Sequence, residues 1–488
     1  MSEEAQVAAD HREVPQFKYP EPDISREQPW QDDELGREQI AERLTILIHN
    51  QHEPFIVSID GRWGSGKTFL LKRWQRDLEI DGFRAIYYNA WEDDFCDDPL
   101  LAIIGQLSHQ FEEDNFRKIA IKAGKLAVRL IAKNVRSVIE KKTGMILDTD
   151  LGEQNGRDLL QDYLDQRETK DCLREELTRL SAAVAEETGR PLVFIIDELD
   201  HCRPTFAIEL LERVKHIFDV PGLVFVFGVN RAELCKSLQS VYGEIDADLY
   251  LNRFFDIGFS LPDANTEPFC RSLMDRYKLE EQFLSLDESA NYRMHSAEYR
   301  RLSQGFPGLC VRLNLSLREI DHCVRLVALI ATTLLEKESM YPDLLAFLIP
   351  LKLKEPSLYR QFILGERRAS EILNYVDGLS TSLAGDRQLD GWLHVTEAYL
   401  YAVEGPIPDV AGGSSAVEQL ELKVQDRDLT HPDLLSTKTQ SAEKRRAEWL
   451  LSRIQSDDAV WSTARWGNGR SELDHLAGLI DFQKTFHM

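Results

Sequence analysis

One octapeptide constrains the fold of this chain more than any other feature: Gly-Arg-Trp-Gly-Ser-Gly-Lys-Thr at residues 61–68. A predicted strand at residues 55–59 leads into it, and apolar residues at helical spacing follow it to residue 78. Glycines at these spacings let backbone N–H groups turn inward at the positive end of the next helix, where they bind phosphate. The sequence therefore predicts a strand, a phosphate-binding loop and a helix in direct succession.

The side chains of this loop have distinct expected roles. The pattern G-x-x-x-x-G-K-[ST] predicts that Lys67 reaches the β- and γ-phosphates of a nucleotide and that the Thr68 hydroxyl binds Mg²⁺. The rest of the binding loop is expected to surround the phosphates with Gly61, Trp63, Gly64, Ser65 and Gly66. A chance match is the alternative interpretation, but the flanking strand and helix disfavour it. The expected ligands are Mg²⁺ and either ATP or GTP.

A second apolar run ends in two acids. Residues 192–196 are all apolar, which is typical of a strand buried on both faces, and Asp197 and Glu198 follow directly. At the carboxyl end of such a strand, Asp197 can hold Mg²⁺ through water. Glu198 is the candidate general base for the attacking water, with a solvated acid at a helix start as the alternative. Asp200 can support the metal or cap the following helix.

Three further residues are candidates for catalysis. Asn230 follows an apolar run at residues 223–229, where it can orient the water; a turn asparagine is the alternative interpretation. Arg253 and Arg318 can stabilise transition-state charge, in cis or from a neighbouring subunit, with surface or ion-paired arginines as the alternative. His201 has no partner at metal-ligand spacing and is expected to be a core or surface histidine.

Alternating strands and helices predict an α/β domain with a mostly parallel sheet and helices on both faces. Strand signals fade after about residue 262, and helical patterns dominate the remainder. The expected organisation is a flexible segment at residues 1–30, a nucleotide-binding domain at 31–262 with a mostly helical insertion at about 100–188, a helical lid at 263–403, and a helical C-terminal region at 404–488.

The net charge of −25 disfavours contact with nucleic acid or anionic membrane except through a local basic patch. Residues 117–142 contain such a patch, with nine basic residues against Glu140 as the single acid. Six of the basic residues are spaced to form one stripe on a helix. Three interpretations remain open: a face paired with the acidic body, a contact with anionic membrane, or a contact with nucleic-acid phosphates.

Other features favour the cytoplasm. The first residues are polar and acidic, without the apolar core of a signal peptide. The longest apolar stretches, at residues 326–335 and 344–353, are shorter than the roughly 20 residues that a membrane span needs. The seven cysteines are scattered without a CxxC pair, which is typical of a reducing compartment.

Taken together, these motifs resemble those of the KAP family of P-loop NTPases, a branch of the AAA+/STAND-like ATPases, over about residues 30–330. The resemblance lies in Asp33-Glu34-Leu35-Gly36-Arg37, the tryptophan inside the loop, Asn89-Ala90-Trp91, the acidic signature from Asp197 to Pro204, and Ser-Leu-Arg-Glu-Ile at 316–320. The family usually has a second Asp where this chain has Glu198. Many members carry transmembrane helices between the two nucleotide motifs, and this insertion is too charged to do so.

The resemblance favours ATP as the nucleotide and implies a setting in bacterial anti-phage defence. Two classes of function fit the sequence. In the first, the chain is a nucleotide-driven switch or assembly ATPase whose nucleotide state controls homo-oligomerisation or an effector protein. In the second, nucleic acid or anionic membrane bound at residues 117–142 stimulates hydrolysis. The absence of a recognisable effector motif favours the first class, and the basic stripe favours the second.

Overall fold

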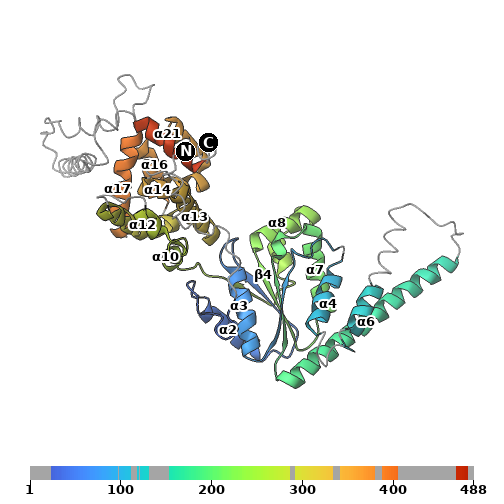
Figure 1. Ribbon diagram of the computed structural model, residues 1–488. Coiled ribbons are helices and arrows are strands. Elements are labelled where there is room, and N and C mark those ends of the chain that lie inside the picture. Colours follow the sequence, from blue (N-terminus) through green and yellow to red (C-terminus); the bar gives the residue numbers. More distant parts are fainter. Residues whose placement is uncertain are drawn as a thin grey trace, which may run out of the picture. The chain divides into compact units, whose positions relative to one another are not determined.

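The computed structural model describes residues 24–96, 98–111, 118–119, 121–130, 153–285, 292–333, 341–379, 387–404 and 469–481. These residues form two compact units, one within residues 22–264 and the other from Asn265 onward (Figure 1). The predicted N-terminal segment before residue 24 and most of the predicted C-terminal region after residue 404 lie outside the described residues. The domain boundaries expected from the sequence stay predictions.

The first unit contains a five-stranded sheet in which every pairing is parallel, with the strand order β2-β3-β4-β1-β5. The strands are β1 Phe55–Asp60, β2 Arg84–Asn89, β3 Leu192–Asp197, β4 Leu223–Val229 and β5 Ile257–Ser260. All residues of β3 and β4 are buried, because helices cover both faces of the sheet. The predicted α/β class with a parallel sheet is confirmed.

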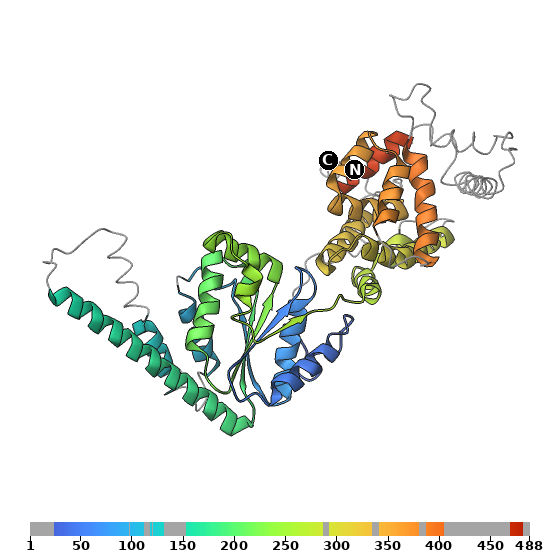
Figure 2. The ribbon, with the colours of Figure 1, turned by 180° about the vertical axis from the view of Figure 1, so that it is seen from behind.

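Alternate residues of the central strands pack on opposite faces, as the two-residue period of a strand requires. Val193 and Ile195 share a core with α2 Glu38–His49 and α3 Lys67–Ile80. The opposite face of β3, with its neighbours, packs on the helices α4 Pro99–Gln110, α6 Glu153–Thr188, α7 Pro204–Ile217, α8 Arg231–Tyr242 and α9 Ala247–Leu251. Figure 2 shows the two helical layers on either side of the strands.

The second unit is helical in all its described elements. They are α10 Thr266–Arg276, α11 Leu279–Ser285, α12 Tyr292–Arg312, α13 Leu317–Thr333, α14 Pro342–Lys354, α15 Pro356–Leu364, α16 Ala369–Gly378, α17 Arg387–Glu404 and α21 Gly469–Ile480. Ten consecutive residues of α14 are buried, so this helix is surrounded by its neighbours on every side. Leu473 and Leu476 of α21 belong to the same core. Among the described helices, none is both long and apolar enough to span a bilayer.

A close approach at Gly228 in β4 fixes the position of the sheet against α3. A Cβ atom there would lie 2.5 Å from Leu71 Cδ1 of α3 and 2.7 Å from the Asp197 Oδ1 atom of β3. We expect Gly228→Ala to lower the free energy of unfolding by about 1–3 kcal/mol, because the core has no room for the added methyl group. Urea denaturation measures this change. The control is Gly258→Ala in the edge strand, where the nearest atom is Ser58 Oγ at 3.4 Å; equal losses in both variants would contradict the packing argument.

Candidate active site

The 61–68 loop connects the end of β1 to the start of α3. Gly64 and Gly66 have φ angles of 74° and 88°, in the left-handed region that glycine enters without a Cβ clash. Lys67 begins α3 and is only 8% exposed. Its Nζ atom donates to the carbonyl oxygen of Gly61 at 2.6 Å, so the ammonium group lies back over the loop. The buried Ser65 Oγ has no hydrogen-bond partner within the described residues, which fits a loop built to receive further polar groups.

Asp197, the last residue of β3, has a fully buried side chain. Its Oδ1 atom accepts a hydrogen bond from the backbone N–H of Glu198 at 2.9 Å, and its Oδ2 atom accepts one from the Tyr87 hydroxyl at 3.0 Å. Burial raises the pKa of Asp197 and the neighbouring charge of Glu198 adds to this shift, while the hydrogen bonds from the Glu198 N–H and the Tyr87 hydroxyl oppose it. A buried carboxylate with a raised pKa lacks enough positive charge around it, which a divalent cation would supply.

Thr68 brings the loop and the acids together. Its hydroxyl donates to Glu198 Oε1 at 3.2 Å, although β4 separates β3, which Glu198 follows, from β1, which leads into the loop. Glu198 has a φ angle of 60°, in the left-handed region that is uncommon for a residue other than glycine. Mg²⁺ needs only one or two protein ligands beside phosphate oxygens and water, and Thr68 with Asp197 fits that requirement. In the described part of the chain, no cluster of three or more His, Cys, Asp or Glu side chains offers another metal site.

Asn230 lies between the loop and the acids, because it follows β4, the strand that separates β1 from β3. Its side chain is 8% exposed and does not cap α8, the helix that begins at the next residue. The capping hydrogen bond comes instead from Asp60, whose Oδ1 atom accepts the Arg231 backbone N–H at 2.8 Å. This position suits the predicted water-orienting role, which stays a prediction.

The structure adds Arg37, which sequence reasoning did not assign to the site. The guanidinium is 1% exposed and donates to the Ser65 carbonyl at 2.9 Å and the Pro262 carbonyl at 2.8 Å. Burial lowers its pKa, while Asp33 and Asp263 act in the opposite direction. Arg37 therefore joins the loop to the chain that leaves β5. Its partners are distant in sequence, so no local pattern indicated this role.

An aromatic cluster, formed by Trp63, Trp91 and His201, lies beside the acids. The imidazole centroid is 5.0 Å from the Trp63 ring and 5.6 Å from the Trp91 ring, with interplanar angles of 31° and 37°. The Trp63 indole N–H donates to Asp200 Oδ2, so Asp200 is a partner of the loop. His201 Nε2 lies 3.0 Å from Glu198 Oε2. The sequence signal for this contact was the three-residue spacing of Glu198 and His201.

The two candidate arginines have different surroundings. Arg253 is exposed, with its guanidinium carbon 5.5 Å from the centre of the Tyr250 ring. Arg318 is exposed on α13 in the second unit, between two residues of a capping box. In that box, the Ser316 N–H donates to Glu319 Oε2 at 2.7 Å and the Glu319 N–H donates to Ser316 Oγ at 3.3 Å. The catalytic roles of both arginines stay predictions.

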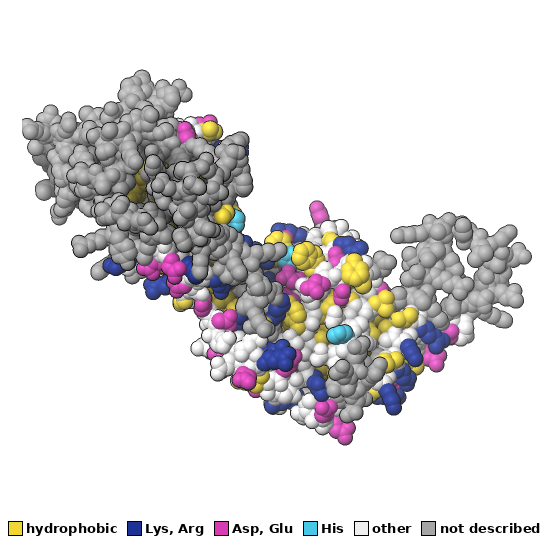
Figure 3. All heavy atoms as spheres, viewed as in Figure 1, with side chains coloured by type: hydrophobic (Ala, Val, Ile, Leu, Met, Phe, Trp, Pro, Cys, Tyr) yellow, Lys and Arg dark blue, Asp and Glu magenta, His cyan; other side chains and the backbone are white. Residues whose placement is uncertain are grey.

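The described part of the basic stripe is helical over residues 121–130, and it buries Ala123, Ala127 and Leu130. Its exposed face carries Lys118, Lys122, Lys125 and Arg129. Lys122 Nζ pairs with Glu176 Oε1 of α6 at 2.5 Å, which favours an intramolecular contact for that residue. Figure 3 shows basic side chains gathered along the arm that α6 forms. The other basic residues of the patch lie outside the described residues: Arg117, Lys133, Arg136, Lys141 and Lys142.

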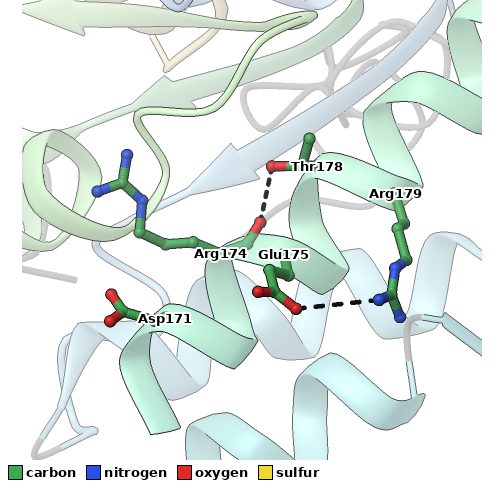
Figure 4. Close-up of a pocket in the computed structure, with 5 residues that line it drawn as sticks. All are labelled: Asp171, Arg174, Glu175, Thr178 and Arg179. Carbon is green, nitrogen blue, oxygen red and sulfur yellow. Dashed lines mark hydrogen bonds and ion pairs between the residues drawn. The ribbon is translucent and has the colours of Figure 1, made fainter. Parts of the chain in front are cut away.

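A surface hollow on α6, with a volume of about 450 Å³, is lined by Asp171, Arg174, Glu175, Thr178 and Arg179 (Figure 4). The Thr178 hydroxyl donates to the Arg174 carbonyl at 2.8 Å, and Arg179 lies 3.9 Å from Glu175. These pairings belong to an ordinary solvated helix surface. The hollow is not a candidate active site.

The segment that contains the loop and the acids matches one family model. A model of the KAP family P-loop domain matches residues 37–334. A search of curated proteins finds no match.

Two solved structures are similar to the chain at low identity. One is the Aeropyrum pernix ORC2 protein in ADPNP–ADP complexes, at 13% identity over 89% of this chain and 98% of that chain, with a TM-score of 0.32. The other is described as a DNA replication initiation factor, at 11% identity over 88% and 98% of the two chains, with a TM-score of 0.26. No conclusion about this chain depends on either, because TM-scores this low do not establish a common fold.

Asp197→Asn tests whether the buried carboxylate serves a metal. The raised pKa means that folding disfavours the charged form, so at neutral pH the neutral amide should leave the unfolding temperature without nucleotide unchanged or higher. In the wild type, Mg²⁺ and ATP at a hundredfold excess over Kd should add about 2.7 kcal/mol of stability. We expect Asp197→Asn, or chelation of Mg²⁺ in the wild type, to remove most of this gain. Thermal unfolding measures both quantities.

The control for this experiment is Asp171→Asn on the exposed surface of α6, which should retain the full gain. A complete nucleotide-dependent shift in Asp197→Asn would show that the carboxylate does not serve the metal.

Proposed function

Because the chain belongs to the KAP family of P-loop NTPases, we propose that it binds ATP with Mg²⁺ and hydrolyses it where the 61–68 loop meets the end of β3. One observation carries this proposal: the Thr68 hydroxyl of the loop donates to Glu198, the residue after Asp197. A hydroxyl that can bind metal, a buried acid and a candidate base thus lie within one small volume. This combination is what phosphoryl transfer to water requires.

Each residue of the proposed site has a distinct role in phosphate binding, metal binding or proton transfer. Backbone N–H groups of the loop and the Lys67 ammonium bind the β- and γ-phosphates. Thr68 and Asp197 would hold Mg²⁺, which when bound would neutralise charge on the phosphate oxygens. Asn230 orients a water molecule, and a carboxylate oxygen of Glu198 takes its proton as the water oxygen bonds to the γ-phosphorus. The bond from that phosphorus to the bridging oxygen breaks, and ADP leaves. Arg253 and Arg318 are candidates to stabilise the charge that develops.

We further propose that the ATPase acts as a switch whose nucleotide state controls self-assembly or an effector protein. Arg37 supports this proposal, because it bonds both the loop and Pro262, which lies three residues before the second unit begins at Asn265. A change in the loop on nucleotide binding therefore reaches the chain that leads into that unit. Cytoplasmic anti-phage defence in bacteria is the setting that the family resemblance suggests.

Phosphate release by Lys67→Ala and Glu198→Gln tests the proposed hydrolysis. Lys67→Ala should lose both ATP binding and phosphate release, since it removes the charge over the loop. Glu198→Gln should bind ATP normally but release phosphate about 10²- to 10⁴-fold more slowly, as expected for a lost general base. The exposed Glu244→Gln is the control and should behave as wild type. Parallel assays with GTP give the nucleotide preference.

Tight ATP binding by the wild type without phosphate release under any condition would contradict the proposed hydrolysis. The chain would then be a nucleotide-gated scaffold.

A second candidate function is an ATPase stimulated by nucleic acid or anionic membrane. It is favoured by the exposed Lys118, Lys125 and Arg129, which form no ion pair within the described part of the chain. A row of exposed cations on an acidic protein is a feature that phosphate groups would recognise.

Charge removal tests this candidate. DNA, RNA or anionic liposomes should raise the ATPase rate if the stripe binds phosphate groups, and Lys125/Arg129→Ala should abolish the stimulation without changing the basal rate. The stimulation should also weaken as salt rises. Arg43/Lys236→Ala removes the same charge from other exposed positions and serves as the control. Undiminished stimulation in Lys125/Arg129→Ala would exclude this helix as the sensor, and the three additives distinguish the partners.

A further inference from the structure

We propose that His201 is a positioning residue for Glu198, and that Trp63 and Trp91 hold its imidazole in place. This inference rests on the proposed hydrolysis, in which Glu198 is the general base. It assigns a function to the aromatic cluster, whose two indoles are partly exposed, at 43% for Trp63 and 58% for Trp91. The contact that both rings share is with the His201 imidazole rather than with a hydrophobic core.

The two oxygens of the Glu198 carboxylate have different partners. Oε1 accepts from the Thr68 hydroxyl at 3.2 Å, and Oε2 lies 3.0 Å from His201 Nε2. The Thr68 hydroxyl thus restrains one oxygen and the imidazole lies at ion-pair distance from the other, so rotation of the carboxylate would break both contacts. A general base must point toward the proton that it accepts, so this restraint fixes the property on which its efficiency depends.

A short helical turn brings His201 to Glu198. The turn η1 covers Leu199–His201, and the His201 backbone N–H donates to the Glu198 carbonyl at 3.1 Å. Side chains three residues apart in such a turn lie on the same side. The imidazole serves as the donor to Oε2 when its proton is on Nε2, which is one of its two neutral tautomers. His201 can therefore hold Glu198 without carrying a net charge.

The two indoles come from different segments at the carboxyl edge of the sheet. Trp63 belongs to the loop after β1, and its N–H is bonded to Asp200. Trp91 follows β2, where the Asn89 side chain accepts the Trp91 backbone N–H at 3.1 Å and so fixes the turn that presents the ring. Both rings contact the imidazole, which limits its rotation. A tryptophan of the loop is thereby linked to the base through one intermediate side chain.

Two substitutions at His201 separate its hydrogen bond from its ring. His201→Phe keeps a ring beside the indoles but removes the N–H donor, whereas His201→Gln keeps an N–H donor but removes the ring. Phosphate release at saturating ATP and Mg²⁺ gives kcat, and calorimetry with ADP gives nucleotide affinity. We expect His201→Phe to lower kcat about 10- to 100-fold, the loss typical of a misplaced catalytic group, with ADP affinity unchanged. His201→Gln should recover part of this loss.

The outcomes distinguish the inference from the function on which it rests. A wild-type kcat in His201→Phe, or equal losses of kcat, ADP affinity and thermal stability in both variants, would overturn the positioning role. Absence of phosphate release by the wild type would overturn the proposed hydrolysis and this inference with it. His216→Gln, an exposed histidine of α7, is the control and should leave every quantity unchanged.

Trp91→Leu tests the contribution of the indoles, because it leaves the His201 donor and the loop intact. It should lower kcat by less than His201→Phe does and leave ADP affinity unchanged. In the double variant Trp91→Leu/His201→Phe, kcat should equal that of His201→Phe alone, since the indole acts through the imidazole. Multiplying losses would show that Trp91 acts independently of His201 and would contradict the proposed arrangement.

Discussion

The buried carboxylate of Asp197, at the end of the central strand β3, is the interaction on which the arrangement of its neighbours most depends. It lies at the end of a fully buried strand, where Tyr87 of β2 and the Glu198 N–H donate hydrogen bonds to it and Gly228 of β4 leaves room for it. Burial of a charge without a full complement of partners lowers stability. A bound divalent cation would offset this cost, in line with the proposed nucleotide site.

Much of the fold follows from local sequence patterns. Continuous apolar runs such as residues 192–196 and 223–229 identified the buried strands, and the intervening helical patterns implied parallel pairing. The order β2-β3-β4-β1-β5 does not follow from periodicity, because the same runs fit several orders of crossover. That order places Asn230 between the loop and the acids, so the geometry of the site depends on information that local patterns do not carry.

The same distinction applies to the site residues. Lys67 and Thr68 begin the helix after the glycine-rich loop and Asp197 ends a strand, so their positions along these elements followed from local spacing. The role of Arg37 did not, since its partners Ser65 and Pro262 lie 28 and 225 residues away. His201 is an intermediate case: its three-residue spacing from Glu198 is local, but its contacts with Trp63 and Trp91 require the assembled sheet. Side chains that connect distant segments are the ones that sequence reasoning misses.

The buried Arg37 also couples the position of the loop to the chain that follows β5. Its guanidinium donates hydrogen bonds to the Ser65 carbonyl in the loop and to the Pro262 carbonyl just after β5, and the residue is almost completely buried. Rotation of the backbone at Pro262 must either carry Ser65 with it or leave a charged donor unpaired in the interior, at a cost of about 1–3 kcal/mol or more. These two hydrogen bonds therefore join the position of the loop to that of the chain just after β5.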